Sequence, residues 1–514
     1  MSTRQEAAVE VAWSALHRRV PLATAVLSLA IAAPAGIGAT RILLGMDLPY
    51  ALVAAGAAGA VLLVLVGAYV HGVTRLRTTR FRLTADRLEL RVGILTRQHR
   101  AIPRDRVRSV DVKADVVRRA FGLAVVKVGT GEHTSGESAE LTLNGLAAAE
   151  AESLRRTLLS GVAARESAQE DGGQAIAGLR WQWVRYAPLS IWVFVGGAVA
   201  IGAIKKVLDV LGLDVFSASM AKAAWEWLIA NPWISVPMVV TGSLLVGLVG
   251  AVGLFAETWG GYRLEREAGT LRVRRGLLTR RSLTLETGRL RGVVVAEPLL
   301  LRLGGGAKVR AVAVGLRKAE GDESEEVSAL TPPMPRAEAV RVASRVLNAS
   351  PSPVAMAGGL DDLRPHPKAA RSRRVRPALA TVAALAAAMA VADLLTGWIP
   401  AAAWALPLIA LPVASALALD AYRGLGHRLT GSHLLTRAGS ALRTTVALDR
   451  GGIVGWRIRQ SFFQRRLGLI TVAATTAAGD GHYDVLDVDA SEGLDLAAQA
   501  VPGLLEPFLL RRES

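Results

Sequence analysis

The chain has 514 residues, of which 51% are hydrophobic and 20% are charged, and its formal net charge is +18. The charged residues are segregated from long apolar runs, a pattern that is typical of membrane proteins and unlike that of soluble ones. No cysteine is present, which excludes disulfide bonds, thiolate metal sites and cysteine nucleophiles.

Six long apolar segments without charged residues follow one another in pairs. A helix rises about 1.5 Å per residue, so roughly 18 apolar residues are needed to cross the hydrocarbon core. All but the fifth reach that length, and the fifth is shortened only by Asp393 near one end. We therefore predict six transmembrane helices in three hairpins. The segments are Val20–Thr40, Leu48–Thr74, Tyr186–Ile204, Leu228–Ala256, Pro377–Ala392 and Leu394–Leu419.

Each pair of apolar segments is followed by a module rich in arginine, in which apolar and polar residues alternate as they do in β-strands. Two glycine positions recur in the modules at nearly constant spacing, which indicates three copies of one unit. A turn glycine comes first, and a second glycine follows within a leucine- or phenylalanine-glycine step. Gly93, Gly276 and Gly439 precede Gly122, Gly304 and Gly468 by 29, 28 and 29 residues, respectively.

The strands of each module give way to a helical pattern at the module's end, and two stretches rich in small, polar residues and proline or glycine read as linkers. The fold class that follows is an α+β membrane protein with a β-rich module and a C-terminal helix after each hairpin. The predicted boundaries are 1–76 for the N-terminal segment and first hairpin, 77–160 for the first module, 161–179 for a linker, 180–257 for the second hairpin, 258–348 for the second module, 349–370 for a linker, 371–422 for the third hairpin and 423–514 for the third module.

Arginine and lysine are unevenly distributed around the hairpins, and such residues mark the cytoplasmic side of a membrane helix. Basic residues surround the outer ends of the first and third hairpins, whereas the turns inside these hairpins hold few charges. The loop of the second hairpin is ambiguous, because its lysines are offset by acidic residues. We therefore expect a multi-pass protein of the cell membrane, with both termini and all three modules in the cytoplasm.

The first module carries a recognisable pattern that begins with FRLTADRLELRVGILTRQHRAIP from Phe81 and continues to Val128. This pattern resembles the bacterial membrane-flanked domain, a pleckstrin-homology-like (PH-like) module of the YdbT type. The second module keeps part of it and the third is the most divergent. The resemblance implies a strongly bent antiparallel β-sandwich capped by a C-terminal helix, and it implies no settled activity.

No catalytic motif is found, and we predict neither a catalytic centre nor a metal or cofactor site. The eight histidines are scattered along the sequence and lack the spacing of metal ligands. The glycine run from Leu303 to Lys308 lacks the spacing of a phosphate-binding loop and is better explained by a turn.

Arginines of the first module are the candidate contacts for an anionic lipid or partner. Arg104, Arg106 and Arg108 are spaced by two residues, so alternation along a strand would place all three on one face. Like charges on one face repel each other unless an anion binds them. A solvated face that only sets the membrane topology is the competing interpretation. We expect the first module to carry whatever binding the protein does. The candidate residues are Arg104, Arg106, Arg108, Arg118 and Arg119.

The third module has its own cluster, in which Arg457, Arg459, Arg465 and Arg466 surround the pair Phe462 and Phe463. We interpret the two phenylalanines as core residues, since large aromatic side chains are usually buried. Insertion into the membrane interface is the alternative.

Three classes of function remain open. The favoured one is a non-enzymatic membrane scaffold whose cytoplasmic modules bind a protein partner, each other or anionic lipid headgroups. A transporter or export accessory subunit is an alternative, although the apolar segments hold few of the ionisable residues that mark a transport path. Membrane-tethered nucleic-acid binding is a second alternative, but aromatic residues for base stacking are few, at 5%, and we expect no nucleic-acid partner.

Overall fold

The computed structural model describes residues 13–46, 49–93, 97–107, 109–129, 140–163, 174–189, 202, 218–267, 269–314, 328–347, 363–397, 399–505 and 507. Two compact units make up the chain, residues 1–287 (unit 1) and residues 288–514 (unit 2). The division falls between two strands of the second predicted module.

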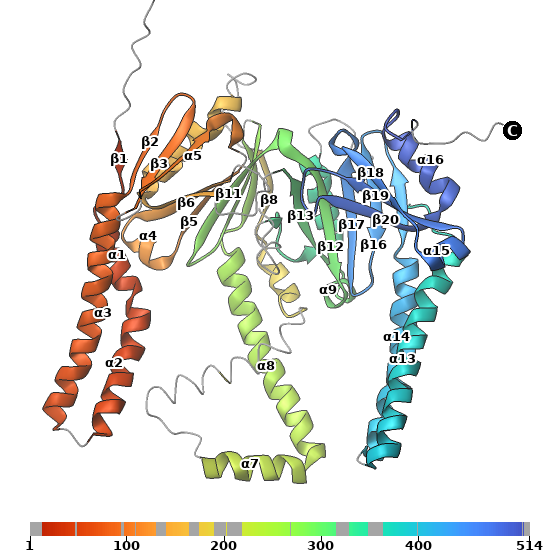
Figure 1. Ribbon diagram of the computed structural model, residues 1–514, viewed down its shortest axis with the longest axis horizontal. Coiled ribbons are helices and arrows are strands. Elements are labelled where there is room, and N and C mark those ends of the chain that lie inside the picture. Colours follow the sequence, from red (N-terminus) through yellow and green to blue (C-terminus); the bar gives the residue numbers. More distant parts are fainter. Residues whose placement is uncertain are drawn as a thin grey trace, which may run out of the picture. The chain divides into compact units, whose positions relative to one another are not determined.

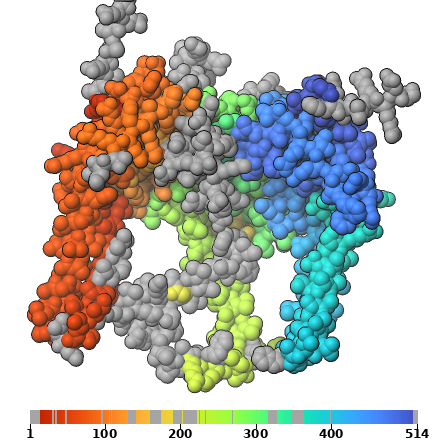
Figure 2. All heavy atoms as spheres, viewed as in Figure 1, coloured from red at the N-terminus to blue at the C-terminus, as the bar shows by residue number. Residues whose placement is uncertain are grey.

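Four helices among the described residues are long and apolar enough to cross a membrane. Unit 1 holds two of them, α3 (Tyr50–Thr78) and α8 (Pro232–Trp259), and unit 2 holds α13 (Lys368–Thr396) and the span 401–423, which is the short turn η5 (Ala401–Trp404) followed by α14 (Ala405–Arg423). In unit 2, α13 and α14 lie side by side as a hairpin that extends from the sheets of that unit (Figures 1 and 2).

Of the other two predicted spans, one is not a single long helix and one lies largely outside the described residues. The segment predicted to begin at Val20 forms two helices, α1 (Val20–Leu27) and α2 (Leu29–Leu44), separated at Ser28, and α2 packs against α3. The span predicted at 186–204 lies almost entirely outside the described residues. Six spans therefore stay a prediction, and four candidate spans are observed.

Unit 1 contains two antiparallel sheets. The first has the strand order β1-β2-β3-β4 and the second β7-β6-β5-β11-β10-β9-β8. The second sheet joins strands of the first predicted module to strands of the second, because β5 pairs along its length with β11. Without this pairing, β5 and β11 would each be an edge strand with unpaired backbone amides and carbonyls. The strands are β1 (Ser14–Ala15), β2 (Arg80–Leu83), β3 (Arg87–Val92), β4 (Gln98–Pro103), β5 (Ser109–Ala114), β6 (Leu123–Gly129), β7 (Glu140–Ala147), β8 (Gln174–Gly178), β9 (Arg263–Glu267), β10 (Thr270–Arg275) and β11 (Arg280–Glu286), and the remaining helices and turns are η1 (Arg104–Arg106), α4 (Val116–Ala120), α5 (Ala148–Ala163), η3 (Trp181–Tyr186), α7 (Ala218–Ala230) and η4 (Thr287–Arg289).

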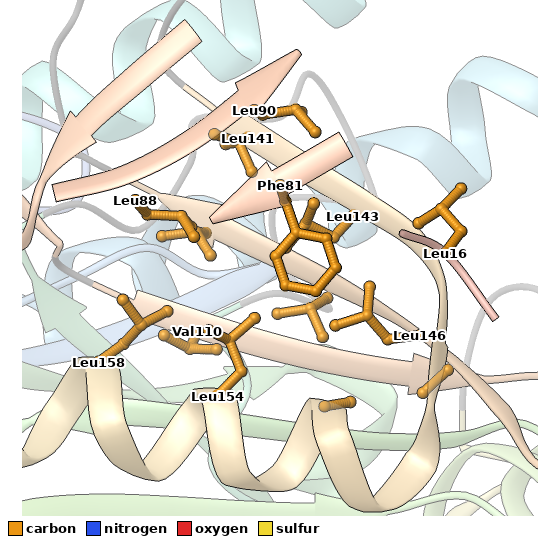
Figure 3. Close-up of a cluster of buried hydrophobic side chains, with 14 of the residues drawn as sticks. Leu16, Phe81, Leu88, Leu90, Val110, Leu141, Leu143, Leu146, Leu154 and Leu158 are labelled. Carbon is orange, nitrogen blue, oxygen red and sulfur yellow. The ribbon is translucent and has the colours of Figure 1, made fainter. Parts of the chain in front are cut away.

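The core of the first module lies between its two groups of strands and the helix α5. Leu154 and Leu158 of α5 point toward Val110 of β5, and Phe81 fills the centre between the strands (Figure 3). Val20 of α1 joins the same cluster. The module's core and the start of its first apolar helix are therefore one packed body.

Unit 2 repeats this arrangement. A six-stranded sheet has the order β14-β13-β12-β17-β16-β15, and a three-stranded sheet has the order β18-β19-β20. Strand β12 of the second predicted module pairs with β17 of the third. The core combines Val294 of β12 with Leu434, Val472 and Leu496. The elements are β12 (Leu290–Pro298), α9 (Leu299–Leu303), β13 (Gly306–Ala313), β14 (Met334–Pro335), α11 (Arg336–Leu347), β15 (Gly426–Leu429), β16 (His433–Ala438), β17 (Leu442–Asp449), η6 (Arg450–Gly452), β18 (Gly455–Arg459), α15 (Phe462–Arg466), β19 (Leu469–Thr475), β20 (His482–Asp489) and α16 (Ala490–Ala500).

The turn glycines take the backbone conformation that the repeat predicts. Gly93, Gly276 and Gly439 have φ of 129°, 105° and 99°, a region that favours glycine because a Cβ atom clashes there. In the middle copy, the prediction of Gly304 as the second glycine is wrong by one position. Gly305, with φ of 74°, follows α9 as the corresponding glycines follow α4 and α15, and the spacing from Gly276 is then 29 residues, as in the other two copies.

Candidate functional site

A carboxylate joins the end of α8 to the neighbouring sheet of unit 1. The backbone amides of Leu278 and Thr279 donate hydrogen bonds to Glu257, at 2.9 and 2.8 Å. These amides belong to the turn between β10 and β11, which begins at Gly276. Leu277 and Leu278, at the tip of the turn, are exposed. Glu257 therefore fixes an exposed apolar turn beside the end of a candidate membrane span.

Asp420 holds the end of α14 in unit 2 in a related way. Its carboxylate accepts hydrogen bonds from Arg302 of α9 at 2.7 Å, from Arg443 of β17 at 2.8 Å and from the Ser440 hydroxyl at 2.7 Å. Ser440 follows Gly439 in the turn between β16 and β17. The Asp420 carboxylate thus connects the span to the turn between β16 and β17, to the start of β17 and to the short helix α9.

The two carboxylates occupy equivalent places, six residues before β9 and β15, respectively. Inspection of the sequence alone missed them. An acidic side chain in the last turns of a helix interacts unfavourably with the negative end of the helix dipole, so it needs a specific partner. An acidic residue at the end of an apolar segment is therefore the sequence signal that could have identified Glu257 and Asp420. The first hairpin has Thr74 at this place, and its hydroxyl donates to the carbonyl of Val70 within α3.

The start of α13 is held by Asp487, a fully buried residue in β20. Arg373 and Arg374 of α13 form ion pairs with its carboxylate, and Gln464 of α15 donates a hydrogen bond to it at 2.8 Å. Asp487 has a φ of 56° at a break in the pairing of β19 and β20, which is costly for a residue with a side chain. The arginines and the glutamine satisfy the buried charge.

Helix α15 presents its two phenylalanines to solvent. Phe462 and Phe463 are 54% and 68% exposed, whereas Gln464 in the same turn is buried. Ser461 and Gln464 form a capping box that starts the helix. The interpretation of Phe462 and Phe463 as core residues is therefore wrong, because the capping box directs Gln464 inward toward Asp487 and leaves both rings outside.

Arg104, the first of the candidate contacts, is used inside the module. Residues 104–106 form the turn η1 and not the strand expected there, since Pro103 fixes the backbone ahead of it. The Arg104 guanidinium donates to the carbonyls of Ala85 and Thr157. Arg450 in unit 2 makes the same kind of contacts, to the carbonyls of Gly431, Gln499 and Ala500. Both arginines join a strand turn to the module's C-terminal helix.

The remaining candidate contacts are not collected on one face. Arg106 is exposed, and Arg108 lies outside the described residues. Arg118 forms an ion pair with Asp115, the residue that caps α4. Arg119 donates to the carbonyl of Leu277 at 2.9 Å, so it joins α4 to the exposed turn beside the end of α8.

A buried ion-pair network connects the two modules that share the sheet of unit 1. Arg272 of β10 donates to Glu152 of α5 at 2.9 Å and to Glu267 of β9 at 3.1 Å, and Arg155 of α5 approaches both glutamates. Burial opposes ionisation of Glu152, but the hydrogen bonds and charges of Arg155 and Arg272 outweigh it and lower its pKa. The network stabilises the contact between modules.

Two of the histidines that are scattered in the sequence meet in unit 2. Nδ1 of His427 lies 3.0 Å from Nε2 of His366, and both rings are buried. Burial lowers the pKa of each to about 4, with further lowering from His427 on His366 and from Arg364 on His427. Within the described parts of the chain, no group of three His, Asp or Glu residues could hold a metal ion.

The family model described as Bacterial PH domain matches residues 24–162 and 378–499, just over half of the chain. The chain belongs to the bacterial PH domain family. Each matched region begins in apolar helices and continues through a bacterial PH module, so the family pattern includes both parts. Neither a curated protein nor a solved structure matches the chain.

The two matched regions correspond to the first and third predicted copies. The second predicted copy lies outside both, so three bacterial PH copies stay a prediction. Strands β9 to β11 and β12 to β14, which belong to that copy, pair with the first and the third copy, respectively. The sequence predicted that the third copy is the most divergent, but the family model matches the third copy and not the second. The strands of the second copy are divided between two sheets, each shared with a neighbouring copy, and this division gives a physical reason for its divergence.

Proposed function

We propose that this bacterial PH domain protein is a non-enzymatic scaffold of the cell membrane, whose modules lie in the cytoplasm and contact the anionic surface of the leaflet from which their helices emerge. The observation that carries the proposal is the direct attachment of the sheets to the ends of the candidate spans. Glu257, Asp420 and Asp487 make these attachments with hydrogen bonds and ion pairs. Modules attached in this way cannot leave the membrane surface.

Charge supports the same proposal. Near an anionic leaflet, each lysine or arginine contributes about 1 kcal/mol to attraction, within roughly one Debye length. Exposed basic residues occur on both units close to the attached ends, among them Arg119 in unit 1, which contacts the turn beside the end of α8, and Arg465 and Arg466 in unit 2. A protein partner that binds the same surfaces is the second candidate, since paired strands already show that the modules bind each other.

Orientation is tested first. Reporter fusions after Ser160 and after Asn348 are expected to report a cytoplasmic location for both. An external location for either fusion contradicts the six-span arrangement and the proposal with it.

Lipid contact is tested with the full chain in nanodiscs of neutral phosphatidylcholine or of mixtures with increasing phosphatidylglycerol. Hydrogen exchange in the segments 116–120 and 455–466 is expected to slow as the anionic fraction rises, and added salt is expected to reverse the change by screening. The turn 430–432, at the far end of the β15–β16 hairpin, is the internal control. Exchange that is independent of lipid charge in both segments contradicts the lipid proposal and leaves a protein partner, which in vivo crosslinking would capture.

A further inference from the structure

The short helix α15 carries an exposed aromatic pair that the fold does not use. The Phe462 and Phe463 rings lie 5.5 Å apart, edge to face, and the guanidinium of Arg466 lies 4.4 Å from the centre of the Phe462 ring. A folded protein that leaves two adjacent phenylalanines exposed retains a large apolar surface in water, and such surfaces mark sites of contact. The occupant of this surface follows from its position and its charge.

The position of α15 is fixed relative to the start of α13. Gln464 of α15 and Arg374 of α13 bind the same carboxylate, that of Asp487. Arg374 precedes Pro377, the first residue of a charge-free run, by less than one helical turn. Helix α15, which carries the phenylalanines, therefore lies beside the part of α13 where the apolar run begins (Figure 1).

The residues around the phenylalanine pair are positively charged, and an anionic leaflet attracts positive charge. Arg465 and Arg466 are exposed in α15, and Arg457 and Arg459 are exposed in β18, at the open edge of the three-stranded sheet. Arg459 also forms an ion pair with Asp484. Aromatic side chains flanked by arginines suit the boundary between headgroups and acyl chains, where rings enter the apolar region and cations stay with phosphates.

We infer that α15 is a membrane-insertion element, in which Phe462 and Phe463 enter the interface of an anionic leaflet while Arg465 and Arg466 bind lipid phosphates. The inference rests on the cytoplasmic orientation proposed above and adds a specific contact to it. It gives the third module a second attachment to the bilayer, beside its helices, and so fixes the module's tilt against the membrane.

The absence of cysteine from the chain permits a direct test. Phe463→Cys is labelled with an environment-sensitive nitrobenzoxadiazole probe, and the full chain is reconstituted in phosphatidylcholine liposomes with or without phosphatidylglycerol. The matched control is Gly431→Cys, in a turn where an added side chain meets nothing within 4 Å. Gly431 lies beyond the four residues of β15, which places it roughly 15 Å from the end of α14 at about 3.3 Å per residue.

In anionic liposomes, lipids that carry a quencher high on the acyl chain are expected to quench the probe at 463 several-fold more than the probe at 431. Aqueous iodide is expected to show the reverse order. Phe462→Ser in the same background, or Arg465→Gln with Arg466→Gln, is expected to lower lipid quenching at 463, and a thermal unfolding midpoint equal to that of the parent shows that folding is retained.

Equal iodide quenching at 463 and 431 overturns the inference. Protection from iodide without lipid quenching overturns it as well, because it indicates that a protein covers the pair. The hydrogen-exchange experiment separates this failure from failure of the proposed function. If exchange at 116–120 and 455–466 still depends on anionic lipid, the modules contact the leaflet and only insertion is disproved.

Discussion

Arg443 of β17 donates a hydrogen bond of 2.8 Å to Asp420 of α14, and this pair joins the last turn of a candidate membrane span to one of the two central strands of the six-stranded sheet. Arg302 shares the same carboxylate. This candidate span is thus not merely a tether for its module, because polar contacts hold the two together.

Asp420→Asn is expected to destabilise unit 2 by about 1–3 kcal/mol, because two largely buried arginines lose a charged hydrogen-bond partner. The measurement is the thermal unfolding midpoint of the purified chain in detergent. Asp495→Asn, at an exposed position on α16, is the matched control and should leave the midpoint unchanged. Equal midpoints for the two variants would show that the contact contributes nothing.

Gly439→Ala is expected to cost more than about 1 kcal/mol, since alanine is strained at positive φ. The added Cβ would also lie 2.0 Å from the carbonyl oxygen of Leu442. Gly431→Ala has space for the methyl group and serves as the control in the same unfolding experiment. Tolerance of both changes would contradict the turn geometry that the repeat shares.

Glu152 and Glu267 are expected to show coupled effects on stability, because both bind Arg272. In a double-mutant cycle with Glu152→Gln and Glu267→Gln, the interaction energy should be about 0.5–3 kcal/mol, the range for residues in one network. The readout is the free energy of unfolding of unit 1 within the full chain, followed by hydrogen exchange in β10. Simple additivity of the two losses would mean that the modules are joined by the strands alone.

Arg450→Gln is expected to destabilise the third module by about 1–3 kcal/mol, since the guanidinium binds three main-chain carbonyls. Arg104→Gln should act likewise in the first module. Arg106→Gln, at an exposed position in the same turn, should cost less stability than either change. A stability loss confined to Arg106→Gln would reverse these assignments.

Acid is expected to weaken unit 2 through the buried histidine pair. Because each folded-state pKa is about 4 and the ordinary value is 6.5, the stabilisation is complete above pH 6.5 and declines as pH falls toward 4. The loss is at most about 1.4 kcal/mol per pH unit for each histidine. Arg364 opposes protonation of His427, whereas Glu492, with an oxygen 3.5 Å from Nε2 of His427, favours it. Asp487 favours protonation of His366.

The pH effect is measured from the exchange of backbone amides in β15 and β16 between pH 7 and pH 4. The variant carrying His366→Gln and His427→Gln removes both titrating groups and should show a flatter profile than the parent. Identical slopes would assign the acid lability to other groups.

The sequence predicted features that depend on local chemistry. The turn glycines Gly93, Gly276 and Gly439 were identified by their repeated spacing, and each has a positive φ, which favours glycine. The placement of the middle copy's second glycine was wrong by one residue, since Gly304 and Gly305 are adjacent and the sequence does not distinguish them.

Contacts between segments that are distant in the sequence could not be predicted from the sequence alone. Nothing in β5 indicates that Val112, which pairs with Val126 of its own module, also pairs with Ser282 of the second module, because strand pairing is decided by packing between distant segments. The same limit explains the error at Phe462, whose exposure depends on a buried hydrogen bond between Gln464 and Asp487. Arg104 and Arg106 were placed on a strand, but they lie in the turn η1.

The pairing of β5 with β11 has a consequence for how the chain can be divided. A fragment that ends between α5 and β8 would keep every helix and strand of the first module, yet its sheet would finish at β5 with unpaired amides and carbonyls. Such an edge recruits strands from other molecules. Expression of isolated modules is therefore expected to give aggregates or swapped dimers, and fragments cut inside the second module, between β11 and β12, should remain soluble in detergent as separate folding units.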